Sequence, residues 1–304
     1  MQYRFTFDTK IIFMKIEASE LIVNSDGSIY HLNLLPDDIS DIVLLVGDPG
    51  RVNLVSGFFS KTEVKKQNRE FITHTGTYKG RRITVLSTGI GTDNIDIVVN
   101  ELDALVNIDL LKREIRDERK SLTLIRMGTS GALQEDVPVH TFLASEMACG
   151  FDGLLNFYSD RDKVCDNEIE AAFVNHTGWN IRLASPYFTK GNNSLVESFK
   201  ECTKGITISA PGFYGPQGRV LRLGIIDPLI NEKITTFSYG GKRITNYEME
   251  CSALYGLSNM LGHNALTVCT IIANRLRKEY SKGYKERVKE MVEMTLETIV
   301  NYNG

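Results

Sequence analysis

Short runs of apolar and β-branched residues alternate along the chain with stretches in which apolar residues recur every three or four positions. Several runs are apolar at every position, which is typical of strands that are covered on both faces. The pattern predicts strands at Ile42–Val46, Arg82–Ser87, Leu122–Met127, Thr141–Ala144, Ile206–Ala210, Thr245–Tyr247 and Leu266–Ile272.

Three helices have clear signals between these strands. Asp93 and Asp96 have the spacing of a helix N-cap and its N3 acid, and apolar residues at helical spacing follow them. A second helix is predicted over Glu250–Leu261, just before a glycine, and a third over Tyr284–Tyr302. Because strands and helices alternate, we predict an α/β fold: a single domain with a central mixed, mostly parallel sheet flanked by helices.

The domain organisation follows from the absence of any Pro/Gly/Ser-rich linker. Residues 29–304 are predicted to form one domain, which an N-terminal extension of residues 1–28 precedes. The densely charged segment Asp109–Lys120 indicates a solvated helix or an excursion between two strands. The first residues lack the features of a signal peptide, so we expect a cytoplasmic location; Met14 is an alternative start site.

Composition excludes several classes of protein. The 304 residues carry 35 Lys+Arg against 38 Asp+Glu, a net charge of −3, which argues against binding to nucleic acid or a membrane surface. A hydrophobic content of 42% is ordinary for a globular protein. The five cysteines are scattered, without a C-x-x-C pair, and the histidines form no H-E-x-x-H motif. We therefore expect neither a disulfide framework nor a metal site.

The turns that follow the strands carry the candidate chemistry, because ligands of open α/β sheets bind beyond the carboxyl ends of the strands. After the first strand, Gly47 allows close backbone approach and Arg51 offers a guanidinium fork that suits phosphate. A plain turn with a surface arginine would also explain this segment. Arg126, near the end of an otherwise apolar strand, is less ordinary because a buried guanidinium needs an anionic partner.

Two further constellations suggest ligand contacts. Gln217 and Arg219 would project together from an extended segment, close to Phe213, and could read a planar ring that carries two carbonyls and an N–H group. A turn with a surface polar pair is the alternative. Met249 and Glu250 lie at a strand-to-helix junction, where the carboxylate could either cap the helix or hold a sugar.

Taken in order, the motifs VLLVGDPGR, R-x-G-T-S-G, FYGPQGR and NYEMEC, with Asn274-Arg275 at the end of the last strand, resemble the nucleoside phosphorylase family, most closely its uridine phosphorylase branch. The resemblance covers most of the chain. It implies reversible phosphorolysis of uridine to uracil and ribose 1-phosphate, with phosphate as co-substrate and no cofactor.

The resemblance also implies roles for individual residues. The phosphate-binding residues would be Gly47, Arg51, Arg126 and Thr129, together with Arg69 lent by a neighbouring subunit. The base-binding residues would be Phe213, Gln217 and Arg219, and the ribose contacts Met249, Glu250 and, again from the neighbour, His31. Catalysis would rest chiefly on Arg219, Gln217 and Arg126.

Partners and alternatives follow from the same resemblance. It implies a homodimer, or a hexamer built from dimers, with shared active sites. Family members bind a monovalent cation at the dimer interface, where Glu70 is the matching acid, but Asn94 stands where a serine is expected. The segment Ala273-Asn274-Arg275 lacks the aspartate of purine-acting relatives. A purine nucleoside phosphorylase, a nucleosidase and a non-catalytic nucleoside-binding relative remain the alternatives.

Overall fold

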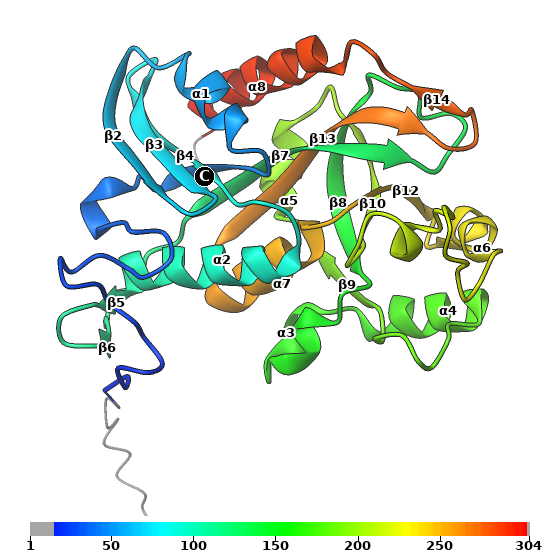
Figure 1. Cartoon of the computed structure of the whole chain (residues 1–304), viewed down its shortest axis with the longest axis horizontal. Helices are drawn as coiled ribbons and strands as arrows, with labels where there is room; N and C mark the ends of the chain where they lie inside the picture. The colour runs from blue at the N-terminus through cyan, green and yellow to red at the C-terminus, as the bar shows by residue number, and fades with distance from the viewer. Residues whose placement is uncertain (1–14, 303–304) are drawn as a thin grey trace, which may run out of the picture.

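The computed structural model describes residues 15–302, and Met14 lies outside this range (Figure 1). Its strands are β1 (Ile42–Val46), β2 (Lys61–Asn68), β3 (Phe71–Tyr78), β4 (Arg81–Ser87), β5 (Ile108–Asp109), β6 (Glu114–Ile115), β7 (Thr123–Ala132), β8 (Phe142–Gly150), β9 (Tyr187–Lys190), β10 (Thr203–Ser209), β11 (Ser238–Tyr239), β12 (Lys242–Glu248), β13 (Asn264–Asn274) and β14 (Glu279–Tyr280). Its α-helices are α1 (Gly50–Ser56), α2 (Thr92–Asn107), α3 (Arg161–Val164), α4 (Asn167–Thr177), α5 (Asn193–Ser198), α6 (Ile230–Thr236), α7 (Cys251–Leu261) and α8 (Tyr284–Val300).

One large mixed sheet organises the molecule. Strands β4, β1, β7 and β13 pair in parallel, and so do β8, β10 and β12. The two blocks join through antiparallel pairing of β13 with β8. The sheet also bends far enough for β12 to pair with the end of β7, at Tyr247 opposite Gly131. This bend brings the carboxyl ends of β7 and β12 together.

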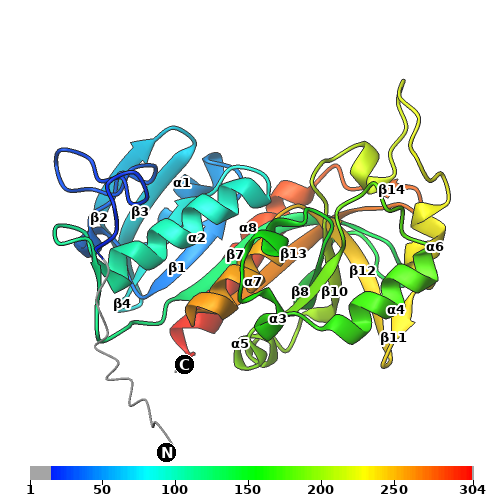
Figure 2. The ribbon, with the colours of Figure 1, turned by 90° about the horizontal axis from the view of Figure 1, so that it is seen from below.

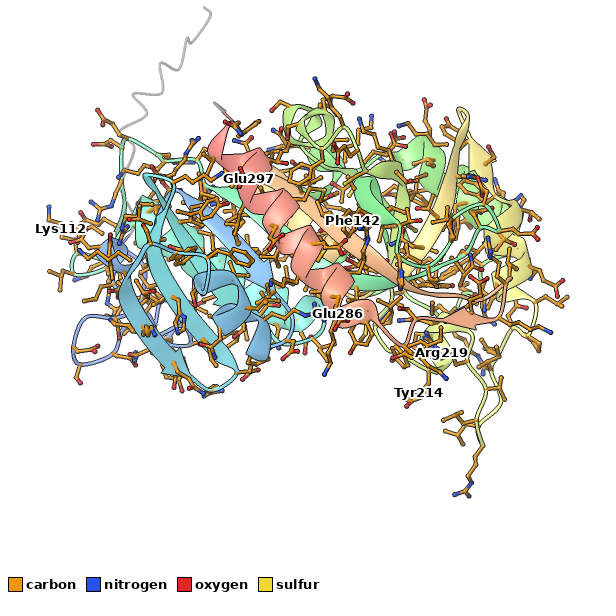
Figure 3. The ribbon with its side chains drawn as sticks, turned by 90° about the horizontal axis from the view of Figure 1, so that it is seen from above. Lys112, Phe142, Tyr214, Arg219, Glu286 and Glu297 are labelled. Carbon is orange, nitrogen blue, oxygen red and sulfur yellow. The ribbon has the colours of Figure 1, made fainter. Side chains whose placement is uncertain are left out.

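Helices cover both faces of the sheet. Figure 2 shows α2 and α7 across one face, and Figure 3 shows α8 across the opposite face. Strand β1 is buried throughout: Val43 and Leu45 belong to the apolar cluster of α2 and α7, while Leu44 and Val46 belong to that of α8. The prediction of an α/β domain whose mixed sheet is flanked by helices is confirmed. Within residues 15–302, no helix combines the length and the apolarity needed to cross a bilayer.

The predicted strands and helices are all present, with differences at their ends. Helix α2 begins at Thr92 with Gly91 as its N-cap, so the prediction of Asp93 as the cap was wrong. Strands β7 and β8 continue well beyond their predicted ends at Met127 and Ala144. The hairpin of β2 and β3 was not predicted. It finishes one edge of the sheet, and β2 is a half-solvated strand in which exposed and partly buried residues alternate.

The charged excursion and the N-terminal segment contact each other. Asp109–Lys120 is an excursion rather than a helix, and it contains the small hairpin of β5 and β6. The backbone N–H of Ile16 donates to the Arg113 carbonyl at 2.8 Å, and Leu21 is buried in the core cluster of α2. The described part of residues 1–28 therefore packs on the domain; the boundary at residue 28 remains a prediction.

Candidate active site

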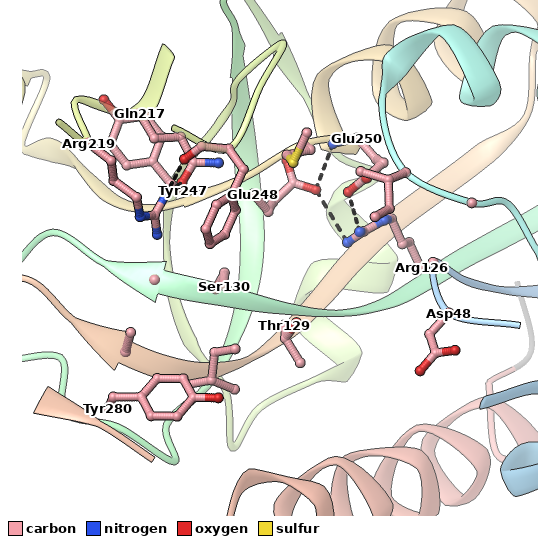
Figure 4. Close-up of a pocket in the computed structure, with 18 of the residues that line it drawn as sticks. Asp48, Arg126, Thr129, Ser130, Gln217, Arg219, Tyr247, Glu248, Glu250 and Tyr280 are labelled. Carbon is pink, nitrogen blue, oxygen red and sulfur yellow. Dashed lines mark hydrogen bonds and ion pairs between the residues drawn. The ribbon is translucent and has the colours of Figure 1, made fainter. Parts of the chain in front are cut away.

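A cavity of about 1060 Å³ opens where the carboxyl ends of β1, β7, β12 and β13 meet the loop after β10. Most of the predicted site residues line it (Figure 4). They are Gly47, Arg51, Arg126, Thr129, Phe213, Gln217, Arg219, Met249 and Glu250. Residues that are far apart in sequence therefore share one cavity, as the position of ligand sites in open α/β sheets predicts.

Arg126 lies at the centre of this site. It occupies an interior position of β7, opposite Leu45 of β1 and Thr267 of β13, and only 5% of it is exposed. Its Nη2 donates to Glu250 Oε2, and its Nη1 lies 3.3 Å from Glu248 Oε2. Burial alone would lower the pKa of Arg126, but the two carboxylates outweigh it and raise this pKa overall. The anionic partner expected for this buried arginine is thus a pair of carboxylates of the same chain, Glu248 and Glu250.

The sequence left open whether Glu250 caps a helix or holds a sugar, and the structure answers the first question. Glu250 stands at the N-cap position of α7, but its side chain makes no capping bond. Its Oε1 instead accepts from the Gly91 N–H at 2.8 Å, while Oε2 faces Arg126. The bonds to the first turn of α7 go to Glu248, which accepts from the Cys251 N–H at 3.0 Å. Glu250 therefore does not cap α7, and its contact with a ribose remains a prediction.

The end of the cavity that is predicted to bind phosphate combines close-packed backbone turns with arginines. A Cβ atom at Gly47 would lie 3.3 Å from the Gly89 carbonyl oxygen, so the two turns lie against each other. Arg51 extends from α1 into the cavity wall. Burial and the charge of Arg126 lower the pKa of Arg51, and Asp48 partly opposes them. Two positive groups in a half-dry site favour an anion, since Coulomb interactions strengthen as water is excluded.

The end of the cavity that is predicted to bind the base contains a connected set of donors and aromatic rings. Arg219 Nη1 donates to Gln217 Oε1 at 2.5 Å, and its guanidinium lies 3.8 Å from the centre of the Phe213 ring. Gln217 is buried, with 3% of its surface exposed. Burial and the neighbouring charge of Arg275 lower the pKa of Arg219 to about 10.

Arg275 and Tyr247 also line this end, and the site prediction did not include them. Arg275 Nη1 donates to the Gln217 carbonyl, and its guanidinium lies 5.2 Å from the centre of the Tyr247 ring. Tyr247 directly precedes Glu248, and Arg275 directly follows β13. Their positions at strand ends could have identified them as candidate site residues. The pairing of β12 with β7 brings the two residues together.

Arg69 and His31 do not line the cavity of the single chain. Arg69 is exposed in the turn between β2 and β3, with a positive φ of 53°. His31 Nδ1 lies 2.6 Å from Glu101 Oε1. The Asn68 side chain donates to the His31 carbonyl at 2.8 Å, so the two segments are neighbours on the surface. Their contribution to a neighbouring subunit's site remains a prediction.

Glu70 and Asn94, the residues at the family's cation position, contact each other. Asn94 Nδ2 lies 3.3 Å from Glu70 Oε1, in the orientation of a donor to the carboxylate. The Asn94 amide therefore faces the acid at the predicted cation position, and its carbonyl oxygen could also serve as a ligand, so a monovalent cation here remains a prediction. Among residues 15–302, no group of three or more His, Cys, Asp or Glu side chains is arranged to hold a metal ion.

Comparisons with known proteins show the family of this chain. The family model described as "Phosphorylase superfamily" matches residues 41–301. The uridine phosphorylase of Thermococcus kodakarensis is 31% identical over 275 residues, which cover 90% of this chain and 87% of that protein. A DeoD-type purine nucleoside phosphorylase of Geobacillus stearothermophilus is 28% identical over 276 residues, or 89% of this chain and 98% of the relative.

A solved structure is similar over nearly the whole chain. A Trypanosoma brucei nucleoside phosphorylase, described as showing uridine phosphorylase activity, superposes with a TM-score of 0.84 at 30% identity. The match covers 93% of this chain and 100% of that one. The chain belongs to the phosphorylase superfamily and is a pentosyltransferase of the nucleoside phosphorylase type.

Proposed function

We propose that this protein catalyses the reversible phosphorolysis of uridine to uracil and ribose 1-phosphate, a reaction of pyrimidine salvage in the cytoplasm. The observation that carries the proposal is the division of one cavity into two ends. Arg51 and Arg126 lie at one end, and the linked pair Gln217 and Arg219 lies at the other. Glu250 lies beside Arg126, where it is suited to accept from ribose hydroxyls.

The chemistry follows from where charge develops. The bond between the ribose C1′ and the uracil N1 breaks, and its electron pair leaves with the base. Positive charge grows on the ribosyl carbon, and a phosphate oxygen held by the two arginines then forms the new bond to it. Negative charge spreads onto the uracil carbonyl oxygens, where Arg219 and the Gln217 amide donate. Donors that gain strength in the transition state accelerate the chemical step.

The base end favours a pyrimidine with two carbonyls. Because the Arg219 donors would meet the exocyclic amine of cytosine donor to donor, they disfavour cytidine. In the segment where purine-acting relatives carry an aspartate, the buried Asn274 side chain donates to the Gln134 and Val137 carbonyls at 2.8 Å each. The Asn274 amide nitrogen is therefore bonded to the backbone of its own chain and is not a free donor for a purine base.

A purine nucleoside phosphorylase is the second candidate, because DeoD-type relatives also match most of the chain. The test is a panel of uridine, deoxyuridine, thymidine, cytidine and inosine, each incubated with and without phosphate. We expect base release from uridine only when phosphate is present. Release without phosphate would indicate a nucleosidase, preference for inosine would indicate the purine enzyme, and tight uridine binding without uracil formation would indicate a non-catalytic relative.

The shared active site is part of the proposal. Arg69 and His31 are neighbours on the surface of one chain but outside its own cavity. This supports a homodimer, or a hexamer of dimers, in which each subunit lends both residues to its neighbour. Arg69→Ala would then raise the KM for phosphate without a change in the cavity of its own chain. Mixing this variant with an Arg51→Ala variant would restore part of the activity in hybrid dimers.

A further inference from the structure

Glu248 is a buried carboxylate at the end of β12 that has no part in the proposed reaction so far. Only 4% of it is exposed. The register of β12 and β10 places it opposite Ser209, whose hydroxyl donates to Glu248 Oε1 at 2.6 Å. Such a buried charge is costly unless hydrogen bonds and an opposite charge compensate it, so its partners indicate what it does.

Two of these partners are residues of the candidate site, Arg126 on the proposed phosphate side and Glu250 on the proposed ribose side. Glu248 Oε2 accepts from the Glu250 N–H at 2.9 Å and lies 3.3 Å from Arg126 Nη1. One carboxylate therefore contacts the phosphate-side cation and the backbone of the ribose-side acid. Figure 4 shows Glu248 between the base end of the cavity and the pair of Arg126 and Glu250.

We propose that Glu248 is a positioning residue for the phosphate site, whose charge anchors Arg126 at Nη1 so that the guanidinium is not drawn wholly onto Glu250. The proposal rests on the proposed function, because it takes Arg126 as a phosphate ligand. Without the anchor, Glu250 alone would neutralise Arg126. Phosphate already has to compete with that buried ion pair for the guanidinium, and the pair would tighten once no carboxylate held Arg126 at Nη1.

Two simpler roles for Glu248 predict different results. If it acted only as a negative charge near the site, it would repel phosphate, and its removal would tighten phosphate binding. If it acted only as the partner of the first N–H groups of α7, its loss would lower stability and leave phosphate affinity unchanged. Positioning predicts weaker binding. The sign of the change in phosphate affinity therefore separates the three roles.

The test is Glu248→Gln in the full chain. The glutamine oxygen can still accept from the Glu250 and Cys251 N–H groups, and its amide can donate to Ser209 Oγ, so mainly the charge is lost. Titration with inorganic phosphate alone, followed by calorimetry at about pH 8, measures the dissociation constant. We expect the Kd to rise about tenfold, the scale of one hydrogen bond to a charged group. The KM for uridine, measured with saturating phosphate, should stay within about twofold, since bound phosphate has then loosened the Arg126–Glu250 pair and the Glu250 backbone keeps its partner.

Ser209→Ala is the matched control. It removes a partner of the same carboxylate but leaves the charge beside Arg126, so its phosphate affinity should equal that of the wild type. If Glu248→Gln does not fold, Glu248→Asp replaces it, because the shorter side chain keeps the charge but withdraws it from Arg126; the same weakening is expected.

Unchanged or tighter phosphate binding in the folded variant would overturn the positioning role. Wild-type protein that binds phosphate but leaves uridine intact would overturn the proposed function, while the comparison of phosphate affinities would still decide the role of Glu248. Wild-type protein that binds no phosphate would overturn both.

Discussion

Arg219 and Gln217 are hydrogen-bonded to each other in the cavity wall, with Arg219 Nη1 donating to Gln217 Oε1 at 2.5 Å. Arg219 also lies over the Phe213 ring, and Arg275 holds the backbone of Gln217. The donors of the proposed base end are therefore held in place by other groups of the protein. Preorganised donors of this kind stabilise a developing anion without the cost of turning toward it during the reaction.

Arg219→Ala is expected to lower kcat for uridine phosphorolysis about 100-fold or more, because it removes a preorganised charged donor from the leaving base. Steady-state kinetics with saturating phosphate measure the effect. Arg222→Ala is the control, since Arg222 is an exposed arginine of the same loop and does not line the cavity. A kcat near that of the wild type in the Arg219 variant would contradict the assigned role.

Arg126→Met is expected to destabilise the protein by about 3–5 kcal/mol, because it leaves Glu248 and Glu250 buried without a cation. Urea unfolding followed by circular dichroism measures the free energy of unfolding. Adding Glu248→Gln and Glu250→Gln to this variant should recover most of the lost stability, although not the activity. If Arg126→Met alone were as stable as the wild type, the burial of Glu248 and Glu250 would not depend on the charge of Arg126.

Gly128→Ala is expected to displace Arg126 and so to disturb the proposed phosphate site. A Cβ atom at this position would overlap Arg126 Nη1 and lie 3.1 Å from Cys269 Sγ, so the guanidinium has to move. We expect a loss of about 1–3 kcal/mol in stability, together with a raised KM for phosphate. Gly131→Ala is the matched control for stability, because its nearest neighbour, the Ala273 carbonyl oxygen, would be 3.9 Å away. Equal unfolding midpoints of the two variants would refute this prediction.

The titration of Glu248 predicts a pH effect on stability. Burial raises its pKa from the ordinary value of 4.5 to about 7, and this outweighs the opposing effect of Arg126. The other titratable groups whose charges interact with it are Glu250, Cys251 and Cys269. A raised carboxyl pKa means that the folded state binds the proton more tightly than the unfolded state does. The contribution of protonated Glu248 to the free energy of unfolding is therefore complete below about pH 4.5, and it is lost as the pH rises through about 7.

Glu248→Gln cannot ionise, so its free energy of unfolding should fall less than that of the wild type between about pH 5 and pH 8. The difference between the two proteins isolates Glu248 from every other titrating group. Parallel pH profiles would mean that the Glu248 pKa is the same in the folded and unfolded states.

Much of the fold could be predicted because local patterns determined it. Strands such as β1 are buried on both faces and read as unbroken apolar runs, and α7 ends at a glycine in the left-handed region, Gly262, with a φ of 82°. The hairpin of β2 and β3 was missed because β2, Lys61–Asn68, carries lysines and little apolar surface. Its strand structure depends on pairing with β3, which a local pattern does not reveal.

The candidate site was predictable in its parts but not in its internal pairing. The motifs pointed to Arg126, Gln217 and Glu250, and the structure brings all three to one cavity. That Arg126 is held by both Glu248 and Glu250 depends on the bend of the sheet that pairs β12 with β7. Spacing along the chain carries no information on such a contact, since more than one hundred residues separate its partners.

The ion pair between Arg126 and Glu250 has a thermodynamic consequence for the proposed reaction. The group suited to phosphate, Arg126, and the group suited to ribose, Glu250, are bonded to each other. Whichever substrate arrives first has to loosen that bond, and it thereby lowers the free-energy cost for the second. Linkage requires the benefit to be mutual, so phosphate should raise the affinity for uridine by the same factor by which uridine raises the affinity for phosphate. Cooperativity between the two substrates would then arise from one shared salt bridge, with no movement of subunits.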